Sequence, residues 1–224
     1  MKNSYPVVVF DAFGTLFDVY SVTAKAEALC PGKGAEISAI WRQKQVEYSW
    51  LRTMSNRYKP FWEITHDALI FALSRLEIDA SSVLIGEMMA QYQKLTAFEE
   101  SKAVLTQPKH AGYRLGILTN GNREMIDAVL QYSGFESFFE HVLTSDVVGK
   151  FKTSDEIYAL VPKAFGVKSE EILFVSSNAW DMDASTWYGF KSFWVNRAIA
   201  PFEILDIAPT MRGETLVDLQ KVLV

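Results

Sequence analysis

Short runs of apolar residues recur along the chain and predict the buried strands of a parallel sheet. Each run is rich in Val, Ile, Leu and Phe and lacks the alternation of apolar and polar positions that a half-exposed strand shows. Strands that are buried on both faces have this pattern. The predicted strands are residues 7–10, 115–118, 172–175 and 193–195, with a weaker candidate at 141–143.

Helical patterns lie between these runs. Residues 123–132 and 156–165 carry apolar positions at helical spacing, and each stretch is followed by a glycine, Gly134 or Gly166, placed to end a helix. Strands that alternate with helices form a parallel sheet with helices on both faces. The sequence therefore predicts an α/β fold with a Rossmann-like parallel sheet as its core.

The spacing of the strands is uneven and predicts an inserted lobe. A strand–helix–strand unit needs only about 30 residues, yet residues 11–114 separate the first two strong strands. Helical patterns fill this stretch, most clearly at 35–54, 61–76 and 83–94. We therefore expect a core domain formed by residues 1–16 and 97–224, and a helical cap domain formed by residues 17–96.

One predicted cap helix, residues 35–54, carries two apolar stripes at the same helical spacing, so it is expected to pack on both sides. If the first stripe packs within the cap, the second faces the sheet and brings Arg42 to the cleft. The first stripe consists of Ile37, Ile40, Trp41, Tyr48 and Leu51, and the second of Arg42, Gln43, Val46 and Trp50.

Composition and charge narrow the class of partner. The net charge is −5 and no Lys/Arg cluster is present, which argues against nucleic-acid and anionic-membrane partners and favours a small soluble substrate. Cys30 is the only cysteine, so no internal disulfide can form, which is typical of a reducing compartment. The apolar run at residues 7–10 is too short for a signal peptide or a membrane span, so we expect a cytoplasmic protein.

Polar residues follow each predicted strand at the edge of the sheet where ligands bind in this architecture. Asp11 follows the first strand, Thr119 and Asn120 the second, and residues 176–178 the third, while Lys152 comes after the weak strand. Burial raises the pKa of such a carboxylate, but a nearby lysine and several hydrogen-bond donors hold it ionised. An ionised, poorly hydrated carboxylate is a nucleophile.

These residues occur within four motifs that resemble those of the haloacid dehalogenase superfamily. They follow one another in the superfamily's order and span nearly the whole predicted core. The first and last motifs are most similar to those of the L-2-haloacid dehalogenases. The four motifs are residues 11–18 (DAFGTLFD), 118–121 (LTNG), Lys152 and residues 174–181 (FVSSNAWD).

Two positions within the motifs favour dehalogenation over phosphate transfer. Superfamily phosphatases place a second Asp two residues after the nucleophile, where this chain has Phe13, and commonly an Asp for Mg²⁺ where it has Ser177. A halide is a stable anion that needs no proton on departure, so a dehalogenase can dispense with the general acid. Its monoanionic substrate likewise needs no metal to mask phosphate charge.

The resemblance implies a role for each matched residue. Asp11 attacks the halogen-bearing carbon with inversion and forms an ester, which water then hydrolyses without metal or other cofactor. Lys152 keeps the nucleophile charged, Arg42 receives the halide, and Asn178 and Asp181 position and help deprotonate the water. Thr15 and Ser177 complete the expected catalytic set, with the role of Ser177 left open. The expected substrate-binding residues are Ala12, Thr119 and Asn120 around the carboxylate, Phe13, Gln43, Val46, Phe61 and Trp180 as the wall, and Tyr158 nearby.

The resemblance also implies a homodimer that acts on a short 2-haloacid and releases a halide. The chain departs from the family pattern at Thr153, where proline is usual, and at Thr119, where serine is common. Two alternatives stay open at this point. One is a Mg²⁺-dependent phosphatase, disfavoured by Phe13 and Ser177; the other is a carbon–nitrogen hydrolase acting on a cyclic imino acid, disfavoured because Arg42 would repel a cationic amine.

Overall fold

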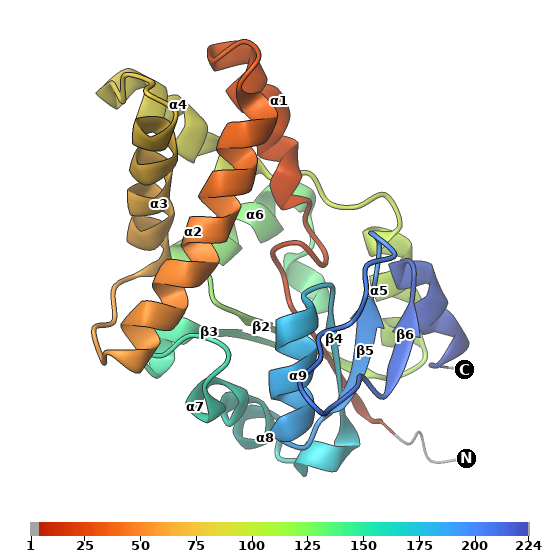
Figure 1. Ribbon diagram of the computed structural model, residues 1–224. Coiled ribbons are helices and arrows are strands. Elements are labelled where there is room, and N and C mark those ends of the chain that lie inside the picture. The colour runs from red at the N-terminus through yellow and green to blue at the C-terminus, as the bar shows by residue number, and fades with distance from the viewer. Residues whose placement is uncertain (1–4, 224) are drawn as a thin grey trace.

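The computed structural model describes residues 5–223 and contains one six-stranded sheet in which all strands are parallel (Figure 1). The strand order is β3-β2-β1-β4-β5-β6, so the first strand lies inside the sheet. This confirms the predicted α/β class. The strands are β1 (Val7–Phe10), β2 (Arg114–Thr119), β3 (His141–Thr144), β4 (Ile172–Ser176), β5 (Lys191–Val195) and β6 (Met211–Gly213).

Both faces of the central strand are buried, which explains why its sequence shows no alternation. Val7 and Val9 pack into a cluster with α7 (Asp155–Tyr158), α8 (Leu160–Phe165) and α9 (Ala179–Trp187). Val8 and Phe10 pack on the other side, in the cluster that includes α5 (Ser101–His110) and α6 (Arg123–Ser133). All four β1 side chains are fully buried, and the sheet is therefore the middle layer of three.

Two details of the core differ from the sequence prediction. The helix expected over 156–165 is two short helices, α7 and α8, because Pro162 has no N–H to bond the carbonyl of Tyr158 and so interrupts the helical ladder. The edge strand β6 was not predicted, since Met211–Gly213 is short, contains an exposed arginine and lacks an apolar run. The predicted ends at Gly134 and Gly166 are confirmed, and both glycines adopt a left-handed conformation.

The segment between β1 and α5 is helical and stands over one end of the sheet (Figure 1). Its two connections to the sheet pair with each other: Asp18 N–H donates to the Thr96 carbonyl (2.8 Å) and Phe98 N–H donates to the Leu16 carbonyl (3.0 Å). The division into core and cap at 16/17 and 96/97 stays a prediction that this pairing supports. The helices are α1 (Val22–Leu29), α2 (Gly34–Met54), α3 (Phe61–Arg75) and α4 (Ser82–Gln91).

Helix α2 packs mainly against α3 and is fixed by a buried polar cluster. The Gln45 amide donates to Thr65 Oγ1 (3.0 Å) and accepts from Tyr92 (3.1 Å), while Trp41 donates to the Thr65 carbonyl (2.7 Å). Within the first predicted stripe, Ile37 and Trp41 are buried, but Leu51 is 47% exposed, because the helix extends beyond its partner there. No helix in residues 5–223 is long and apolar enough to cross a membrane.

Candidate active site

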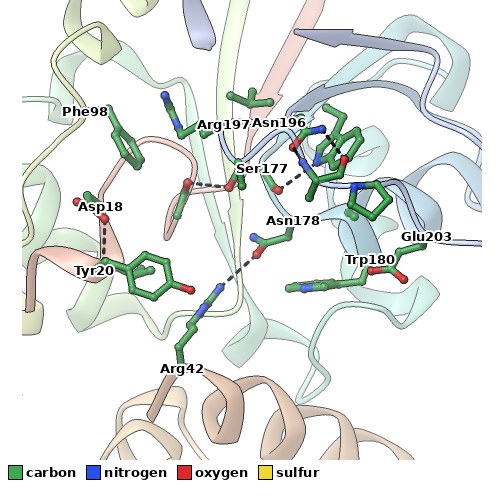
Figure 2. A pocket seen from close by; sticks show the side chains of 18 residues that line it. Asp18, Tyr20, Arg42, Phe98, Ser177, Asn178, Trp180, Asn196, Arg197 and Glu203 are labelled. Atoms are coloured by element: carbon green, nitrogen blue, oxygen red, sulfur yellow. Dashed lines mark hydrogen bonds between the residues drawn. The ribbon is translucent and has the colours of Figure 1, made fainter. Parts of the chain in front are cut away.

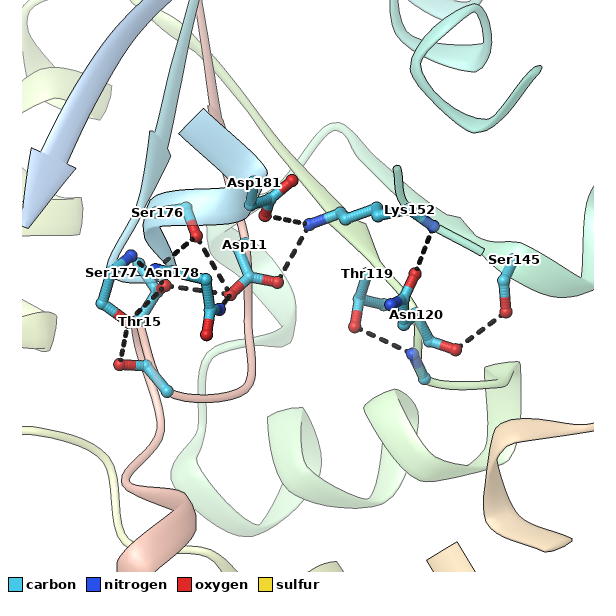
Figure 3. Close-up of polar contacts among 12 residues, drawn as sticks. Asp11, Thr15, Thr119, Asn120, Ser145, Lys152, Ser176, Ser177, Asn178 and Asp181 are labelled. Atoms are coloured by element: carbon cyan, nitrogen blue, oxygen red, sulfur yellow. Dashed lines mark hydrogen bonds and ion pairs between the residues drawn. The ribbon is translucent and has the colours of Figure 1, made fainter. Parts of the chain in front are cut away.

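Asp11 lies where three neighbouring strands end. Phe10 pairs with Ile117 on β2 and with Val175 on β4, so the residues that follow these strands meet at one edge of the sheet. Figure 3 shows Asp11 between Thr119 and Asn120 on one side and residues 176–178 on the other. Asp11 is only 5% exposed. The fold thus places a carboxylate in a largely dry position, surrounded by polar side chains.

Lys152 reaches this carboxylate from the loop after β3. Its fully buried Nζ lies 3.0 Å from Asp11 Oδ1 and 2.8 Å from Asp181 Oδ2 (Figure 3). Its backbone N–H donates to Asn120 Oδ1 (2.8 Å), which fixes the loop. Burial alone lowers the pKa of Lys152, but the charges of Asp11 and Asp181 outweigh burial and the net pKa is raised. Lys152 is therefore a permanent cation at neutral pH, and Thr153 does not prevent it from pointing at Asp11.

The two oxygens of Asp11 have different surroundings. Oδ2 accepts hydrogen bonds from Thr15 Oγ1 (2.9 Å), Asn178 Nδ2 (3.1 Å) and Ser176 Oγ (3.5 Å). Oδ1 accepts from Lys152. A carboxylate oxygen has two lone pairs, so within the described residues Oδ1 keeps one lone pair free. Oδ1 is therefore the oxygen suited to attack, and Oδ2 is the oxygen that the protein holds.

Asp181 and Tyr158 form a second layer behind Lys152. The Tyr158 hydroxyl donates to Asp181 Oδ1 (2.6 Å), and both residues are fully buried. Burial raises the pKa of Tyr158 well above its ordinary value, with a further contribution from the Asp181 charge. Burial and the charge of Asp11 likewise raise the pKa of Asp181, although Lys152 opposes them. Asp181 is therefore a stronger proton acceptor than a carboxylate in water.

A small cavity of about 20 Å³ adjoins Asp11. It has room for about one water molecule. Aromatic and aliphatic side chains from both lobes close it, and Trp50 of α2 packs edge-on against Trp180 of the core, with ring centroids 5.8 Å apart. The lining residues are Asp11, Phe13, Arg42, Val46, Ser49, Phe61, Thr119, Asn120, Asn178 and Trp180.

Arg42 enters this cavity from α2, on the side that the second predicted stripe indicated. Its Nη2 lies 3.4 Å from Asn178 Oδ1, which is a long contact. Figure 2 marks this contact with a dashed line. No carboxylate among residues 5–223 forms an ion pair with Arg42. Its charge is therefore available to an anion in the cavity.

Backbone donors border the same space. The N–H groups of Phe13 and Asn120, which line the cavity, and of the neighbouring Ala12 form no backbone–backbone hydrogen bond in the part of the chain that the structure describes. They lie beside Thr119, whose hydroxyl accepts from Gly121 N–H (3.1 Å). Converging N–H groups at the ends of strands suit an anionic group such as a carboxylate.

Three predicted site residues lie elsewhere. Gln43 is exposed and does not line the cavity. Arg42 and Val46 are four residues apart and share one face of α2, whereas Gln43 lies to the side of that face. Tyr158 is enclosed by the core and contacts Asp181 rather than the cavity. The Ser177 hydroxyl donates to the Gly14 carbonyl (2.7 Å) and lies 3.3 Å from Thr15 Oγ1, so it supports the first motif without reaching Asp11.

Two residues of the site were given no role by the sequence. Ser176 was expected at the ligand-binding edge, and the pairing of Phe10 with Val175 makes it the neighbour of Asp11 across the sheet, where it donates to Asp11. Ser49 lines the cavity one helical turn beyond Val46, and its hydroxyl donates to the Val46 carbonyl (2.7 Å). Its spacing of seven residues from Arg42 placed it on the same helix face.

Within residues 5–223, no three His, Cys, Asp or Glu side chains are grouped so that they would hold a metal ion. The ammonium of Lys152 lies between the two carboxylates of the site, Asp11 and Asp181. A cation supplied by the protein itself therefore occupies the position that offers the most negative charge.

A nearby buried acid, Asp183, gives a stability prediction. Asp183 is 1% exposed, and neither of its carboxylate oxygens has a hydrogen-bond partner among the described residues. Burial, and then the charge of Glu203, raise the pKa of Asp183. An acid with a higher pKa in the folded state costs stability as the pH rises through and above the ordinary carboxyl range.

We therefore expect Asp183→Asn to raise the melting temperature at pH 7.5, by about 2–4 °C for each kcal/mol recovered. The gain should shrink at pH 5, because more of the wild-type carboxyl is then protonated and uncharged. Calorimetry at both pH values measures this difference. A melting temperature that falls, or a gain that grows toward pH 5, would contradict the interpretation of Asp183 as an unpaired buried acid.

Comparisons with known proteins agree with this geometry. The family model described as haloacid dehalogenase-like hydrolase matches residues 5–186. An (S)-2-haloacid dehalogenase of Pseudomonas sp. (strain YL) is 41% identical over 202 residues, which cover 90% of this chain and 87% of the relative.

Two solved structures are similar over nearly the whole chain. The L-2-haloacid dehalogenase RSc1362 is 46% identical with a TM-score of 0.97, covering 98% of this chain and 99% of that one. The L-2-haloacid dehalogenase from Xanthobacter autotrophicus, solved with chloropropionic acid covalently bound, is 34% identical with a TM-score of 0.91 and 98% coverage of both chains. The matched family model and these similarities show that the chain belongs to the haloacid dehalogenase-like hydrolase family, among relatives that are (S)-2-haloacid dehalogenases.

Proposed function

We propose that this protein is an (S)-2-haloacid dehalogenase that hydrolyses short 2-haloalkanoic acids to 2-hydroxy acids with inversion and without a metal. The observation that carries the proposal is Asp11 itself: a buried carboxylate with one oxygen held by donors and the other free beside a lysine cation. The names of the similar proteins support the same reaction class.

In the first step, Oδ1 of Asp11 attacks the carbon that bears the halogen. The carbon–oxygen bond forms as the carbon–halogen bond breaks, and the bonding electron pair leaves with the halide. Attack from the side opposite the halogen inverts the carbon centre. The aromatic walls formed by Phe13, Phe61 and Trp180 exclude water from the nucleophile, which strengthens it.

The substrate carboxylate and the leaving halide need separate positive regions. Backbone N–H groups of Ala12, Phe13 and Asn120, together with the Thr119 side chain, are assigned to the carboxylate. Arg42 enters from the cap and is assigned to the halide, since its charge has no carboxylate partner in residues 5–223. This arrangement aims the carbon–halogen bond from Asp11 toward the cap.

In the second step, water attacks Cγ of the ester on Asp11. Oδ2, the carbonyl oxygen of that ester, then carries the developing negative charge. Thr15, Asn178 and Ser176 already donate to Oδ2 and stabilise this charge as an oxyanion hole does.

Asp181, whose pKa is raised by burial, is assigned to accept the proton of the water. It lies behind Lys152 and does not line the cavity, so the proton reaches it by way of the Lys152 ammonium, which donates to both carboxylates. Collapse of the intermediate breaks the bond between Cγ and the substrate oxygen, and Asp181 returns its proton to that oxygen, so that the hydroxy acid leaves. The second proton of the water passes to solvent, which restores the Asp11 carboxylate.

Phe13 and Ser177 favour a haloacid over a phosphate ester as the substrate. An alkoxide needs a general acid on departure, and Phe13 cannot supply a proton. The Ser177 hydroxyl, at the position where the phosphatases commonly have an Asp for Mg²⁺, donates a hydrogen bond to the Gly14 carbonyl. These two positions separate the proposed reaction from a phosphatase on the same fold.

The experiment uses two substrates, each with and without a chelator. Purified protein with EDTA is given 2-chloropropionate or p-nitrophenyl phosphate, and chloride or phosphate is measured. We expect chloride release from the (S)-enantiomer that EDTA leaves unchanged. Phosphate release that requires Mg²⁺, with no chloride release, would overturn the proposal. The homodimer and the cytoplasmic location expected from the sequence stay predictions that sedimentation and cell fractionation would test.

A further inference from the structure

A second, larger cavity lies directly beside the active-site cavity, and three residues line both. We call this larger cavity the outer chamber; its volume is about 440 Å³, against about 20 Å³ for the cavity at Asp11. Arg42, Asn178 and Trp180 line both cavities and so form the partition between them (Figure 2). Any 2-haloacid is larger than one water molecule, so the inner cavity must open to admit substrate.

The partition is held by a long polar contact. Its polar link is the contact of Arg42 Nη2 with Asn178 Oδ1 at 3.4 Å, longer than an ordinary N–H···O hydrogen bond of about 2.7–3.2 Å. Arg42 belongs to α2 in the helical lobe, whereas Asn178 and Trp180 belong to the core at the start of α9. A small separation of the two lobes therefore breaks this link, while the shorter bonds that hold Asp11 lie within the core.

The outer chamber reaches solvent on its far side. The loop that follows β5 forms that wall, and its residues Ala198, Ala200 and Pro201 are exposed. The chamber therefore connects bulk water with the side of Arg42 that faces away from Asp11.

Two acidic residues, Asp18 and Glu203, line the chamber, so the attraction for an anion rests on Arg42, which it shares with the inner cavity. Arg197 is paired with Glu100 (2.5 Å) and stacks on Phe98, with its guanidinium 3.7 Å from the ring centroid. Asp18 accepts a hydrogen bond from Tyr20 N–H (2.8 Å), and Glu203 is exposed to water. Arg42 is then the cation of the chamber wall without a carboxylate partner in residues 5–223.

Resting on the proposed function, we propose that the outer chamber is the passage by which the 2-haloacid enters and the halide leaves, with the Arg42–Asn178 contact as its gate. A halide bound to Arg42 after the displacement needs only to pass to the other side of the same guanidinium to reach the chamber. The hydroxy acid stays behind as the ester until hydrolysis. The two products therefore leave in sequence, halide first.

The test places a removable obstruction in the chamber of the folded enzyme. In a Cys30→Ser background, Ala198→Cys puts a thiol on the chamber wall, and Ile204→Cys puts one on the same loop at a position that is 96% exposed and lines neither cavity. Each protein is assayed before and after reaction with benzyl methanethiosulfonate, and again after dithiothreitol removes the group. Each variant is compared with itself before and after modification, so its starting activity need not equal that of the wild type.

We expect the benzyl group on residue 198 to lower kcat/KM at least about fivefold for chloroacetate and further for 2-chlorobutanoate, and dithiothreitol to restore it. The single-turnover rate of ester formation on Asp11, measured by acid quench and mass spectrometry at saturating substrate, should stay within about twofold, since chemistry inside the cavity is untouched. The same group on residue 204 should change neither value.

Unchanged kcat/KM for modified Ala198→Cys with both substrates would overturn the passage. A fall in the single-turnover chemical rate would overturn it as well, because it would show that residue 198 acts on the reaction itself. A parent protein that releases no halide from any haloacid would instead refute the proposed function, so the two failures are distinguishable.

Discussion

Replacing Asp11 with asparagine is expected to lower chloride release from (S)-2-chloropropionate at least about 10⁴-fold, the loss typical of removing a covalent nucleophile. The amide has the same shape as the carboxylate and still accepts a bond from Lys152, so the fold should be retained. It lacks the negative charge that drives attack on saturated carbon. Chloride release and circular dichroism, measured together, check both halves of this expectation.

Asp127→Asn is the matched control, because Asp127 is an exposed carboxylate on α6 that pairs only with Arg123 (2.7 Å) at the surface. Its activity should lie within about twofold of the wild type, as for most surface substitutions. Wild-type turnover in Asp11→Asn would remove Asp11 from the mechanism.

Replacing Lys152 with methionine is expected to damage both activity and stability. The change leaves Asp11 and Asp181, both buried, without the cation that lies within 3.0 Å of each. Breaking a buried ion pair from one side typically costs about 3–5 kcal/mol of unfolding free energy. Loss of the cation that lies beside the attacking oxygen of Asp11 should lower activity at least about 10²-fold.

The stability that Lys152→Met loses is expected to depend on pH. Burial and the charge of Asp11 raise the pKa of Asp181, and Lys152 opposes them, so removing Lys152 raises the pKa of Asp181 further and the variant loses stability as the pH rises. Urea unfolding should therefore show a larger deficit against the wild type at pH 8 than at pH 5.5. Lys150→Met is the control, since Lys150 binds the Thr53 carbonyl (3.2 Å) outside the site. A deficit that is smaller at pH 8 would contradict the buried triad.

The sequence was most informative where a local pattern and a strand end coincide. The apolar run before Asp11 predicted both the central strand and the position of the carboxylate, because a strand buried on two faces shows one continuous run and ends at the ligand-binding edge. The second stripe of α2 placed Arg42 on the correct side for the same reason: helical spacing fixes which residues share a face.

The sequence was least informative where long-range packing decides. Gln43 belongs to the same predicted stripe as Arg42. It lies outside the contact between α2 and the core, however, so its side chain is exposed to water. Tyr158 matched a site position, and only the depth of the core shows that its hydroxyl binds Asp181 instead of reaching the cavity. The buried bonds of Gln45 with Thr65 and Tyr92 join residues far apart in sequence, which periodicity does not reveal.

The motifs of the family and the three-dimensional structure each revealed different features of the site. Motif order identified the family and assigned Lys152 to Asp11 across 141 positions of sequence, which no spacing rule predicts. The contrast between Oδ1 and Oδ2 of Asp11, and the division of the space around Arg42 into two cavities, came only from coordinates.

Isotope labelling shows whether an oxygen of Asp11 becomes the new oxygen of the product. Enzyme in excess over (S)-2-chloropropionate completes one turnover in H₂¹⁸O, and mass spectrometry locates the label. The mechanism predicts lactate without ¹⁸O and a single ¹⁸O in the peptide that contains Asp11, because water attacks Cγ of the ester. Lactate that carries ¹⁸O after the first turnover, with Asp11 unlabelled, would show that water attacks the substrate directly and would contradict the account.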